Sequence, residues 1–392
     1  MASGYTSRTG RQAGSSNGVH IEFTTVITGV SESVRGEAVQ DVIAPGLIDL
    51  QVNGFAGVDF NDPAITPEDL AGSVQRLFET GVTRFLPTVV TGPRERITGA
   101  LRNLAAARRE FRRSGMPAAD AIAGFHIEGP HISPEDGPRG AHPRQYVRPP
   151  DIEEFHRWQE AAVGEIRLVT LSPEYPEAPR YIAALVDAGV VVAIGHTGAN
   201  LQQIQAAVDA GATMSTHLGN GTHPLLHKTS NYIWDQLAED RLTASFIADG
   251  IHLPRNFLAA AIRCKSPNRS VLVTDALMVA MCSPGFYQLG EIPVELTPDN
   301  RAVVRGTTRL AGSGLTMNRA VANCVRLTGV PLDAALAMAT VNPARAARIA
   351  GRQNGLVLGE TADMVLFQWD ESARSLTVQE TIVAGKTAYQ AR

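Results

Sequence analysis

The stretch AIAGFHIEG, residues 121–129, is a short apolar run that stops at a charged residue, Glu128. The same pattern occurs in VVVAIGH, which ends at His196, in ATMSTH, which ends at His217, and in SVLVTD, which ends at Asp275. Apolar runs of roughly four to eight residues that end at a turn are typical of buried parallel strands. Because such strands present polar groups at their carboxyl ends, the four side chains are expected to meet at one edge of a sheet.

The pattern repeats along the chain and indicates the fold class. Helical patterns separate several of the apolar runs: Thr66, Pro67 and Asp69 are typical of a helix start, and Asn200 starts another helix that ends near Gly211. Alternating strands and helices predict an α/β protein with a (β/α)8 TIM barrel. The eight strand-like segments are LIDLQVNG (47–54), VTRFLPTVV (82–90), AIAGFHIEG (121–129), IRLVTLSPE (166–174), VVVAIGHTG (190–198), ATMSTHLGN (212–220), ASFIADG (244–250) and SVLVTDA (270–276).

The two ends of the chain predict a small second domain. Residues 313–351 have helical patterns rich in alanine and leucine, and residues 355–390 then alternate short β-type runs with turn signals. The segment from His20 to Ala44 is expected to pair with these later strands. The predicted domains are a disordered tail over 1–18, a small discontinuous β-sandwich-like domain from 19–44 and 355–392, and the barrel over 45–354.

Composition excludes several classes of partner. The 392 residues are 44% hydrophobic and carry a net charge of −4, so no strong field would recruit nucleic acid or an anionic membrane. Three widely spaced cysteines favour a reducing compartment over a disulfide framework. Neither a secretory signal nor a run long enough to span a membrane is recognisable. We therefore expect a cytoplasmic enzyme.

Three of the strand-end residues form a candidate metal site. Glu128, His196 and His217 offer one carboxylate and two imidazoles, a set that binds a divalent ion and leaves a position for water. Such an ion lowers the pKa of bound water to about 7, which supplies a nucleophile for amide hydrolysis. Each residue could instead make only structural hydrogen bonds, but three of them on separate strand ends favour the metal. We expect one divalent ion, zinc in the first place, although iron, manganese and cobalt also accept these ligands.

Two further residues are candidates for catalysis. Asp275 is expected to take a proton from the attacking water and return it to the leaving nitrogen, as general base and then acid; the alternative is an aspartate that caps the next loop. His142 lies in a loop rich in glycine and proline and could donate to the carbonyl oxygen as charge develops there. His126 and His131, near the same loop, are expected to pack or brace rather than to react.

The first strand carries two amides where a binuclear hydrolase would have histidines. These are Gln51 and Asn53, and amides are weak metal ligands compared with imidazole. They therefore favour one tightly held ion rather than two. We expect Gln51 and Asn53 to brace the site by hydrogen bonds.

The motifs taken together resemble the N-acetylglucosamine-6-phosphate deacetylases of the amidohydrolase superfamily. The resemblance runs from about Ala44 to Asp363. It implies release of acetate from a 2-acetamido sugar phosphate, with the metal on Glu128, His196 and His217 and with Asp275 as acid and base. The motifs are PGLIDLQVNG, GFHIEGPHISPEDGPRGAHP, AIGHTGAN, THLGNG, ADGIHL, VTDA, RLAGSG and NPARAARIAG.

The resemblance also implies a phosphate site. In that family, an asparagine and the next backbone amide hold the phosphate, together with a basic residue of a neighbouring subunit and a histidine in a DG-x-H motif. The matching positions are Asn220, Gly221, Lys228 and His252. A solvated loop lysine is the alternative for Lys228, one of only three lysines in the chain. The family arrangement implies a homodimer.

One loop departs from the family pattern. The loop is THLGNGTHPLLHK, residues 216–228. Gly219 precedes the asparagine, where the family more often has an aromatic residue, and Gly221 and Thr222 follow it, where the family more often has Ala-Met. Gly219 and Gly221 loosen the backbone. His223 and His227 could bind phosphate, another acidic group or each other's backbone. There are two alternatives to a deacetylase of an amino-sugar phosphate. One is an amidohydrolase for a different N-acyl or cyclic amide, and the other is a sugar-phosphate-binding barrel without catalysis. The presence of all four strand-end residues speaks against the second alternative.

Overall fold

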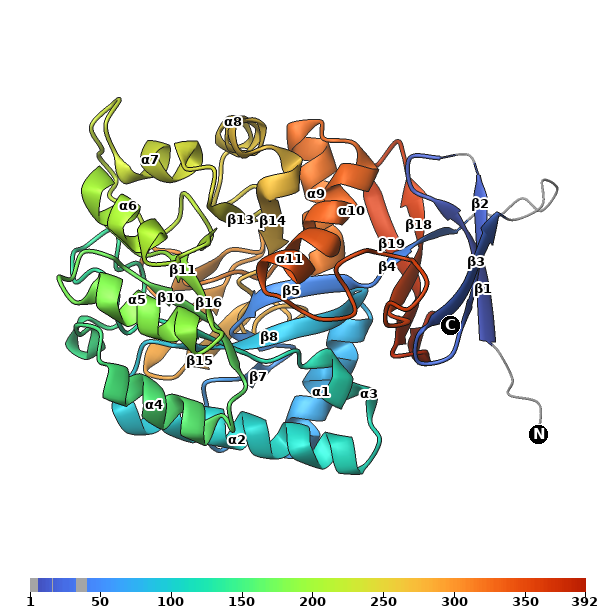
Figure 1. The fold of residues 1–392 in the computed structure, drawn as a ribbon, viewed down its shortest axis with the longest axis horizontal. Helices are drawn as coiled ribbons and strands as arrows, with labels where there is room; N and C mark the ends of the chain where they lie inside the picture. The colour runs from blue at the N-terminus through green and yellow to red at the C-terminus, as the bar shows by residue number, and fades with distance from the viewer. Residues whose placement is uncertain (1–5, 16, 33–40) are drawn as a thin grey trace.

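The computed structural model describes residues 6–15, 17–32 and 41–392, and its centre is a sheet of eight parallel strands (Figure 1). The strands follow chain order around the sheet, and a bridge between Val52 and Ala276 joins the end of the first to the end of the last. The expected (β/α)8 barrel is confirmed. Its strands are β5 (Leu47–Val52), β8 (Val82–Val90), β9 (Phe125–Glu128), β10 (Ile166–Leu171), β11 (Val191–Ile194), β12 (Met214–Ser215), β13 (Thr243–Ile247) and β14 (Ser270–Val273).

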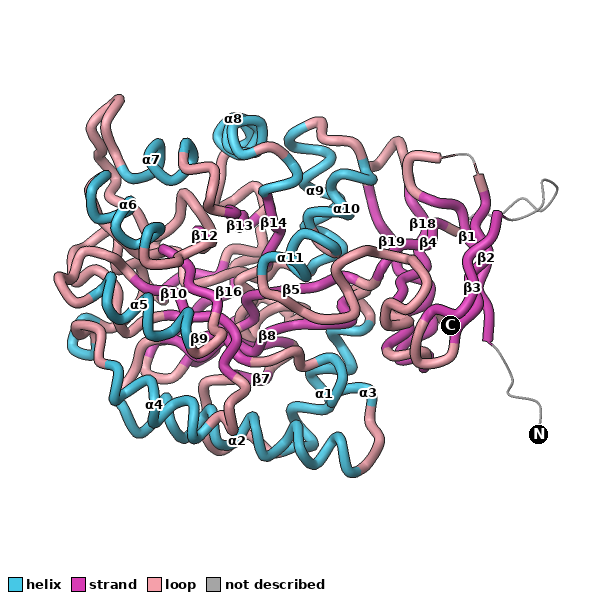
Figure 2. The backbone as a smooth tube through the Cα atoms, in the orientation of Figure 1, coloured by secondary structure: helices cyan, strands magenta, loops and turns pink. Residues whose placement is uncertain are grey.

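Helices form the outer layer of the barrel, as Figure 2 shows. The two helix starts expected from sequence are present: the Thr66 hydroxyl accepts from the Asp69 N–H at 3.0 Å, and Asn200 forms a capping box with Gln203. The helices are α1 (Pro67–Phe78), α2 (Arg94–Arg113), α3 (Pro117–Ala121), α4 (Ile152–Ala161), α5 (Ala178–Asp187), α6 (Leu201–Asp209), α7 (Tyr232–Ala238), α8 (Arg255–Lys265), α9 (Met317–Thr328), α10 (Leu332–Met338) and α11 (Val341–Ala346).

Both ends of the chain build a second, seven-stranded sheet beside the barrel (Figure 1). Strand β4 pairs with β18 in antiparallel register, so that Ala44 faces Val365. A separate core that includes Ile21, Phe23 and Met364 joins side chains from both ends of the chain. The β domain built from both ends of the chain is therefore confirmed for the described residues; residues 33–40 of its predicted first segment lie outside them. Its strands are β1 (Thr6–Gln12), β2 (Gly18–Phe23), β3 (Ile27–Glu32), β4 (Val42–Pro45), β18 (Met364–Asp370), β19 (Ser375–Val383) and β20 (Lys386–Gln390).

The expected disordered tail is wrong over residues 6–12. Residues Thr6–Gln12 form β1, which pairs antiparallel with β2 and parallel with β4. The strand is polar, so its order comes from pairing with two neighbours rather than from apolar burial. Residues 1–5 and 16 of the predicted tail lie outside the described residues.

A three-stranded sheet that the sequence analysis did not anticipate follows the last barrel strand. It consists of β15 (Gly285–Leu289), β16 (Ile292–Leu296) and β17 (Ala302–Val304). Its apolar face forms a small separate core with residues that follow β14, among them Leu277 and Val279. A short pair, β6 (Gly54–Phe55) and β7 (Val58–Asp59), lies directly after β5. Both insertions follow carboxyl ends of barrel strands, where the loops of this fold carry the active site.

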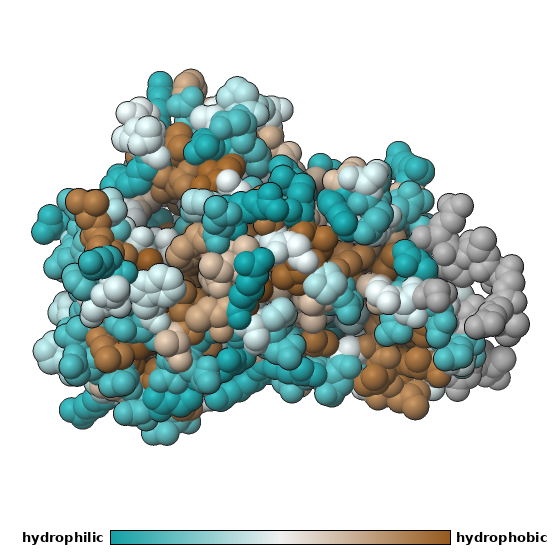
Figure 3. All heavy atoms as spheres, turned by 90° about the horizontal axis from the view of Figure 1, so that it is seen from above, coloured by the Kyte–Doolittle hydropathy of each residue, from teal (hydrophilic) through white to brown (hydrophobic). Residues whose placement is uncertain are grey.

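Hydrophilic side chains cover most of the barrel surface on the face drawn in Figure 3, and apolar side chains lie there in separate areas. Among the described helices, none combines the length and the apolar character needed to cross a membrane.

Candidate active site

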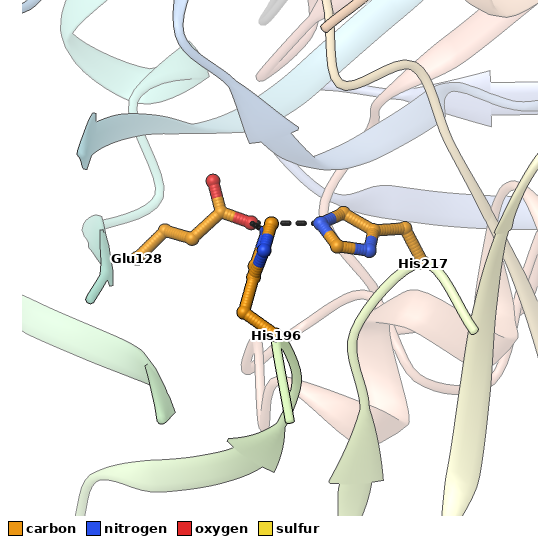
Figure 4. Close-up of side chains that lie close together, drawn as sticks. All are labelled: Glu128, His196 and His217. Carbon is orange, nitrogen blue, oxygen red and sulfur yellow. Dashed lines mark hydrogen bonds and ion pairs between the residues drawn. The ribbon is translucent and has the colours of Figure 1, made fainter. Parts of the chain in front are cut away.

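Glu128, His196 and His217 meet at the carboxyl ends of three barrel strands. Glu128 is the last residue of β9, and the two histidines follow β11 and β12 (Figure 4). One carboxylate oxygen of Glu128 lies 3.2 Å from Nε2 of His196 and 2.8 Å from Nε2 of His217. All three residues are buried, and their ligand atoms lie within 4.8 Å of one another. The structure thus brings together the three residues that the sequence analysis proposed as metal ligands.

The backbone is strained at several of these positions. His196, His217 and Asp275 have φ values of 50°, 29° and 51°, in the left-handed region that side chains other than glycine rarely adopt. Such conformations cost about 1–3 kcal/mol each and concentrate at functional sites. Each strand therefore turns sharply at the residue that faces the site.

A backbone carbonyl orients the imidazole of His196. Its Nδ1 lies 2.8 Å from the carbonyl oxygen of Pro138, so this nitrogen carries the proton and donates it. The lone pair of Nε2 is then free and faces Glu128. Metal-binding histidines commonly have this arrangement, in which the second nitrogen fixes the tautomer.

Two amides hold the carboxylates of the site. The side-chain amide of Gln51 donates to Glu128 at 2.8 Å and to Asp275 at 3.1 Å, and Asn53 donates to the same oxygen of Asp275 at 2.6 Å. Burial and then the nearby Glu128 carboxylate raise the pKa of Asp275 to about 6. Burial alone would also raise the pKa of Glu128, but the close approach of the His196 and His217 imidazoles holds it well below the ordinary value.

Asp49 is a buried carboxylate to which the sequence analysis gave no role. It accepts from the Thr274 hydroxyl at 2.5 Å and from the backbone N–H groups of Thr274 and Gln51, both at 3.2 Å. Burial raises its pKa to about 7. Asp49 thereby joins β5 to the residue before Asp275. The sequence does contain a sign of this role. Asp49, Gln51 and Asn53 are spaced two residues apart, so their side chains lie on the same face of the strand.

His142 lies against the metal-ligand cluster. Its ring centroid is 4.4 Å from that of His196, with the rings nearly perpendicular. Burial and then the neighbouring His196 lower the pKa of His142 to about 3, so its imidazole is neutral at pH 7. A neutral imidazole in this position has an N–H that can be donated to a carbonyl oxygen.

One cavity of about 690 Å³ opens over these side chains. Most of the predicted site residues line it: Asn53, Glu128, His142, His196, His217, Asn220, Gly221, His252 and Asp275. Gln51 lies behind this lining, where it reaches Glu128 and Asp275. Lys228 is exposed on the loop before α7 and does not line the cavity of its own chain.

The predicted phosphate ligands are fixed by local contacts. Asn220 donates to the carbonyl of His217 from its backbone and from its side chain, both at 2.9 Å. His252 Nδ1 lies 2.6 Å from Asp249, which leaves the other ring nitrogen for the cavity. Arg309, which the sequence analysis missed, also lines the cavity from the segment after β17. It is the one guanidinium in the described lining.

His126 and His131 make structural contacts, in keeping with their exclusion from the proposed site. His126 lies between the hydroxyls of Thr88 and Thr170, at 3.2 and 2.8 Å. His131 stacks on Trp158 with ring centroids 5.5 Å apart, and its Nδ1 lies 3.2 Å from the carbonyl of Arg148. Both imidazoles are buried, and burial lowers the pKa of each to about 4.

Comparisons with known proteins agree on one family. Residues 42–388 match the amidohydrolase family. The chain is 35% identical to a bovine (Bos taurus) N-acetylglucosamine-6-phosphate deacetylase over 361 residues, which is 89% of this chain and 84% of that protein. The Bacillus subtilis enzyme of the same name is 32% identical over 343 residues, with 87% and 84% covered.

Solved structures show the same relationship. A variant of N-acetyl-D-glucosamine-6-phosphate deacetylase from Mycobacterium smegmatis, in complex with N-acetyl-D-glucosamine-6-phosphate, matches with a TM-score of 0.85 and 29% identity, over 98% of this chain and all of that one. The enzyme from Thermotoga maritima matches with a TM-score of 0.82 and 27% identity, over 95% of both chains. The chain therefore belongs to the amidohydrolase family and, within it, to the N-acetylglucosamine-6-phosphate deacetylases.

Proposed function

We propose that this protein hydrolyses N-acetylglucosamine 6-phosphate to glucosamine 6-phosphate and acetate, with the help of one divalent metal ion. The observation that carries the proposal is the placement of Glu128, His196, His217 and Asp275 around one cavity, in a chain of this family. The cavity also holds polar groups suited to a sugar phosphate. Its volume of about 690 Å³ is within the range of small-molecule sites.

The donor set fits a divalent ion. Both histidines direct Nε2 at one carboxylate oxygen, and the Pro138 carbonyl holds His196 in the tautomer with a free lone pair. We propose zinc, because two imidazoles and a carboxylate suit this ion. When bound, the ion lowers the pKa of water and polarises the amide carbonyl. The amides Gln51 and Asn53, which already donate to carboxylates, support one ion rather than two.

Asp275 is placed to move the proton in the reaction. Its carboxylate faces the cavity and is held by Asn53 and Gln51. It takes a proton from the attacking water and gives it to the amine nitrogen as the C–N bond breaks, which releases acetate and the free amine. His142, neutral and in the same lining, donates an N–H to the carbonyl oxygen as negative charge develops.

The phosphate would lie at the Asn220 end of the cavity. The backbone of Gly221, the side chain of Asn220 and the free nitrogen of His252 supply donors there. We propose that Lys228 adds a positive charge to the cavity of a partner subunit, since it is exposed and outside the cavity of its own chain. A lysine offers a point charge, without the two-pronged fork of an arginine.

We therefore also propose a homodimer. Leu225 and Trp234, on either side of Lys228 in the sequence, are 89% and 49% exposed, which suits an interface. The mass in solution at micromolar concentration tests this, and a fully active monomer would contradict it. We further propose a cytoplasmic location, which the odd number of widely spaced cysteines supports.

The first test is acetate release by zinc-loaded protein from N-acetylglucosamine 6-phosphate and from unphosphorylated N-acetylglucosamine at equal concentration. A preference of roughly a hundredfold or more in kcat/KM, about 2.7 kcal/mol, is expected for the phosphorylated sugar. Failure on both sugars, in protein shown to hold the metal, would mean that the enzyme acts on a different amide. Protein that purifies without a divalent ion in the absence of chelator would count against hydrolysis altogether.

A further inference from the structure

A histidine outside the proposed catalytic groups joins two loops of the active site. We call residues 129–143, which follow β9 and carry His142, the catalytic loop; residues 216–231, between β12 and α7, are the anion loop. In the anion loop, Nε2 of His223 lies 2.8 Å from a carboxylate oxygen of Glu135 in the catalytic loop. Its Nδ1 lies 3.0 Å from the hydroxyl of Tyr232 at the start of α7. The imidazole thus bridges a catalytic-loop side chain and a helix.

Every polar group of this bridge has a partner. The backbone N–H of His223 donates to the Tyr232 hydroxyl at 2.8 Å, and that hydroxyl can donate its own proton to Nδ1. Nε2 then carries the proton and donates it to Glu135. One neutral tautomer satisfies all three contacts. Tyr232 is 5% exposed, so one end of the bridge is anchored in the interior.

The two loops are also in close backbone contact at the bridge. A Cβ atom on Gly137 would lie 2.9 Å from Cα of His223 and 3.0 Å from the carbonyl of Thr222, closer than side chains normally approach. A Cβ on Gly221 would lie 3.0 Å from the carbonyl of Pro138. Both glycines have positive φ. Gly137 and Gly221 allow the loops to pack without side chains between them. This packing gives a function to Gly221, one of the two glycines by which the anion loop departs from the family pattern.

Each loop is connected to a proposed metal ligand. The Pro138 carbonyl in the catalytic loop accepts from His196, and the anion loop itself contains His217, whose carbonyl accepts from Asn220. Residues of both loops line the cavity, including His142 on one side and Asn220 on the other. A change in how the loops pack would therefore alter the distance between His142, which donates to the carbonyl oxygen, and Asn220, which holds the phosphate.

We propose that His223 is a positioning residue that locks the anion loop onto the catalytic loop through Tyr232 and Glu135, and so sets the span between His142 and the phosphate donors. The exposed pair with Glu135 would contribute little alone, because its carboxylate is 61% exposed. The lock depends on the anchored tyrosine and the backbone contact in addition to this pair. The roles of His142 and of the phosphate donors rest on the proposed function, whereas the contact between the two loops does not.

Hydrogen–deuterium exchange of the metal-loaded protein tests the lock without any substrate. In His223→Ala, amide exchange should rise severalfold in residues 133–143 as well as in residues 218–224. His223→Asn keeps an acceptor for Tyr232 but loses Glu135, so its change should be smaller. His227→Ala is the matched control, since His227 is exposed and its ring, among the described residues, accepts only from the backbone of Thr229 and Ser230 in the same loop. Unchanged exchange in residues 133–143, or an equal effect of His227→Ala, would overturn the lock.

Kinetics test its consequence for the substrate. His223→Ala should raise KM for N-acetylglucosamine 6-phosphate about tenfold, while kcat/KM for the unphosphorylated sugar changes less than threefold. Equal losses on both sugars would overturn the positioning of phosphate against carbonyl. If the unmutated protein hydrolyses neither sugar, the proposed function fails, and the exchange experiment still decides whether His223 locks the loops.

Discussion

The side chain of Asp275 is held so that it can exchange a proton but not move. Asn53 and Gln51 both donate to one of its oxygens, and burial raises its pKa to about 6. Asp275→Asn should lower kcat by about 10³-fold, because an amide cannot accept the proton but still accepts these two hydrogen bonds. Metal content by mass spectrometry should match the unmutated protein. A variant that retains more than a tenth of kcat would rule out Asp275 as the general base.

The buried His131 makes the free energy of unfolding depend on pH. Its pKa is about 4 in the folded state because it is buried, against an ordinary value of 6.5, so the unfolded state binds more protons between these values. The free energy of unfolding should therefore fall as pH drops from 6.5 towards 4. His131→Phe keeps the ring packed on Trp158 and removes this proton uptake.

The measurement is urea unfolding of metal-free protein at pH 7 and pH 4.5. His131→Phe should lose about 2 kcal/mol less stability between the two pH values than the unmutated protein. His156→Gln is the control, because that imidazole is exposed on α4. An unchanged pH dependence in His131→Phe would show that this histidine does not remain neutral in the folded state.

Among single residues, those at strand ends could be predicted and those fixed by distant loops could not. Glu128, His196, His217 and Asp275 follow apolar runs, and parallel strands bring their carboxyl ends together, so the sequence pattern alone predicts that they meet. The partners of His223 come from a loop 88 residues away and from the next helix. No local pattern connects them, and three alternatives for this histidine stayed open until the structure placed it.

The strands after β14 could not be predicted from the alternation of apolar runs and helical patterns. The barrel strands stand out because they are buried on both faces, whereas β15 and β16 mix exposed, half-buried and buried residues around a tight turn at Gly290. They pack on residues that follow the eighth strand and bring Arg309 into the cavity wall. The three-stranded sheet thus adds a positive charge to the site that the strand ends do not predict.

Arg309 has no ion-pair partner among the described residues, so its guanidinium is available to an anionic substrate. Arg309→Ala should raise KM for N-acetylglucosamine 6-phosphate about tenfold, because a hydrogen bond to a charged group contributes about 1.5–3 kcal/mol. The control is Arg305→Ala in the same segment, whose guanidinium lies 4.3 Å above the Phe286 ring and outside the cavity lining. Equal KM values for both variants and the unmutated enzyme would remove Arg309 from substrate binding.

At the scale of the whole molecule, the discontinuous domain was predictable in outline. The change of composition at residue 355 separates the later strands from the barrel, and the β-type segment before the first barrel strand is expected to join them. Strand β1 could not be predicted, because Thr6–Gln12 has few apolar residues and its order depends on β2 and β4. Sheet pairing across the chain supplied information that composition lacks.

One buried carboxylate lies at the junction between the two domains. Asp363, fully buried, accepts from Arg84 at 2.6 Å, from the backbone N–H of Ala384 at 2.6 Å and from the buried Arg352, which also donates to the Gly46 carbonyl. Gly46 directly precedes β5, so these contacts join the second sheet to the first barrel strand. Asp363→Asn would leave two guanidinium groups near the junction without a charged partner.

We therefore expect Asp363→Asn to lower the free energy of unfolding by about 3 kcal/mol, as for other buried ion pairs that lose one charge. Urea unfolding at a fixed metal concentration measures the change. Asp299→Asn is the control, since Asp299 pairs with Arg301 at 2.7 Å on the surface and exposed pairs contribute less than about 1 kcal/mol. Because the catalytic loops lie at the other ends of the strands, Asp363→Asn protein that remains folded should keep its KM. A loss of stability no larger than that of Asp299→Asn would mean that this ion pair does not hold the two domains together.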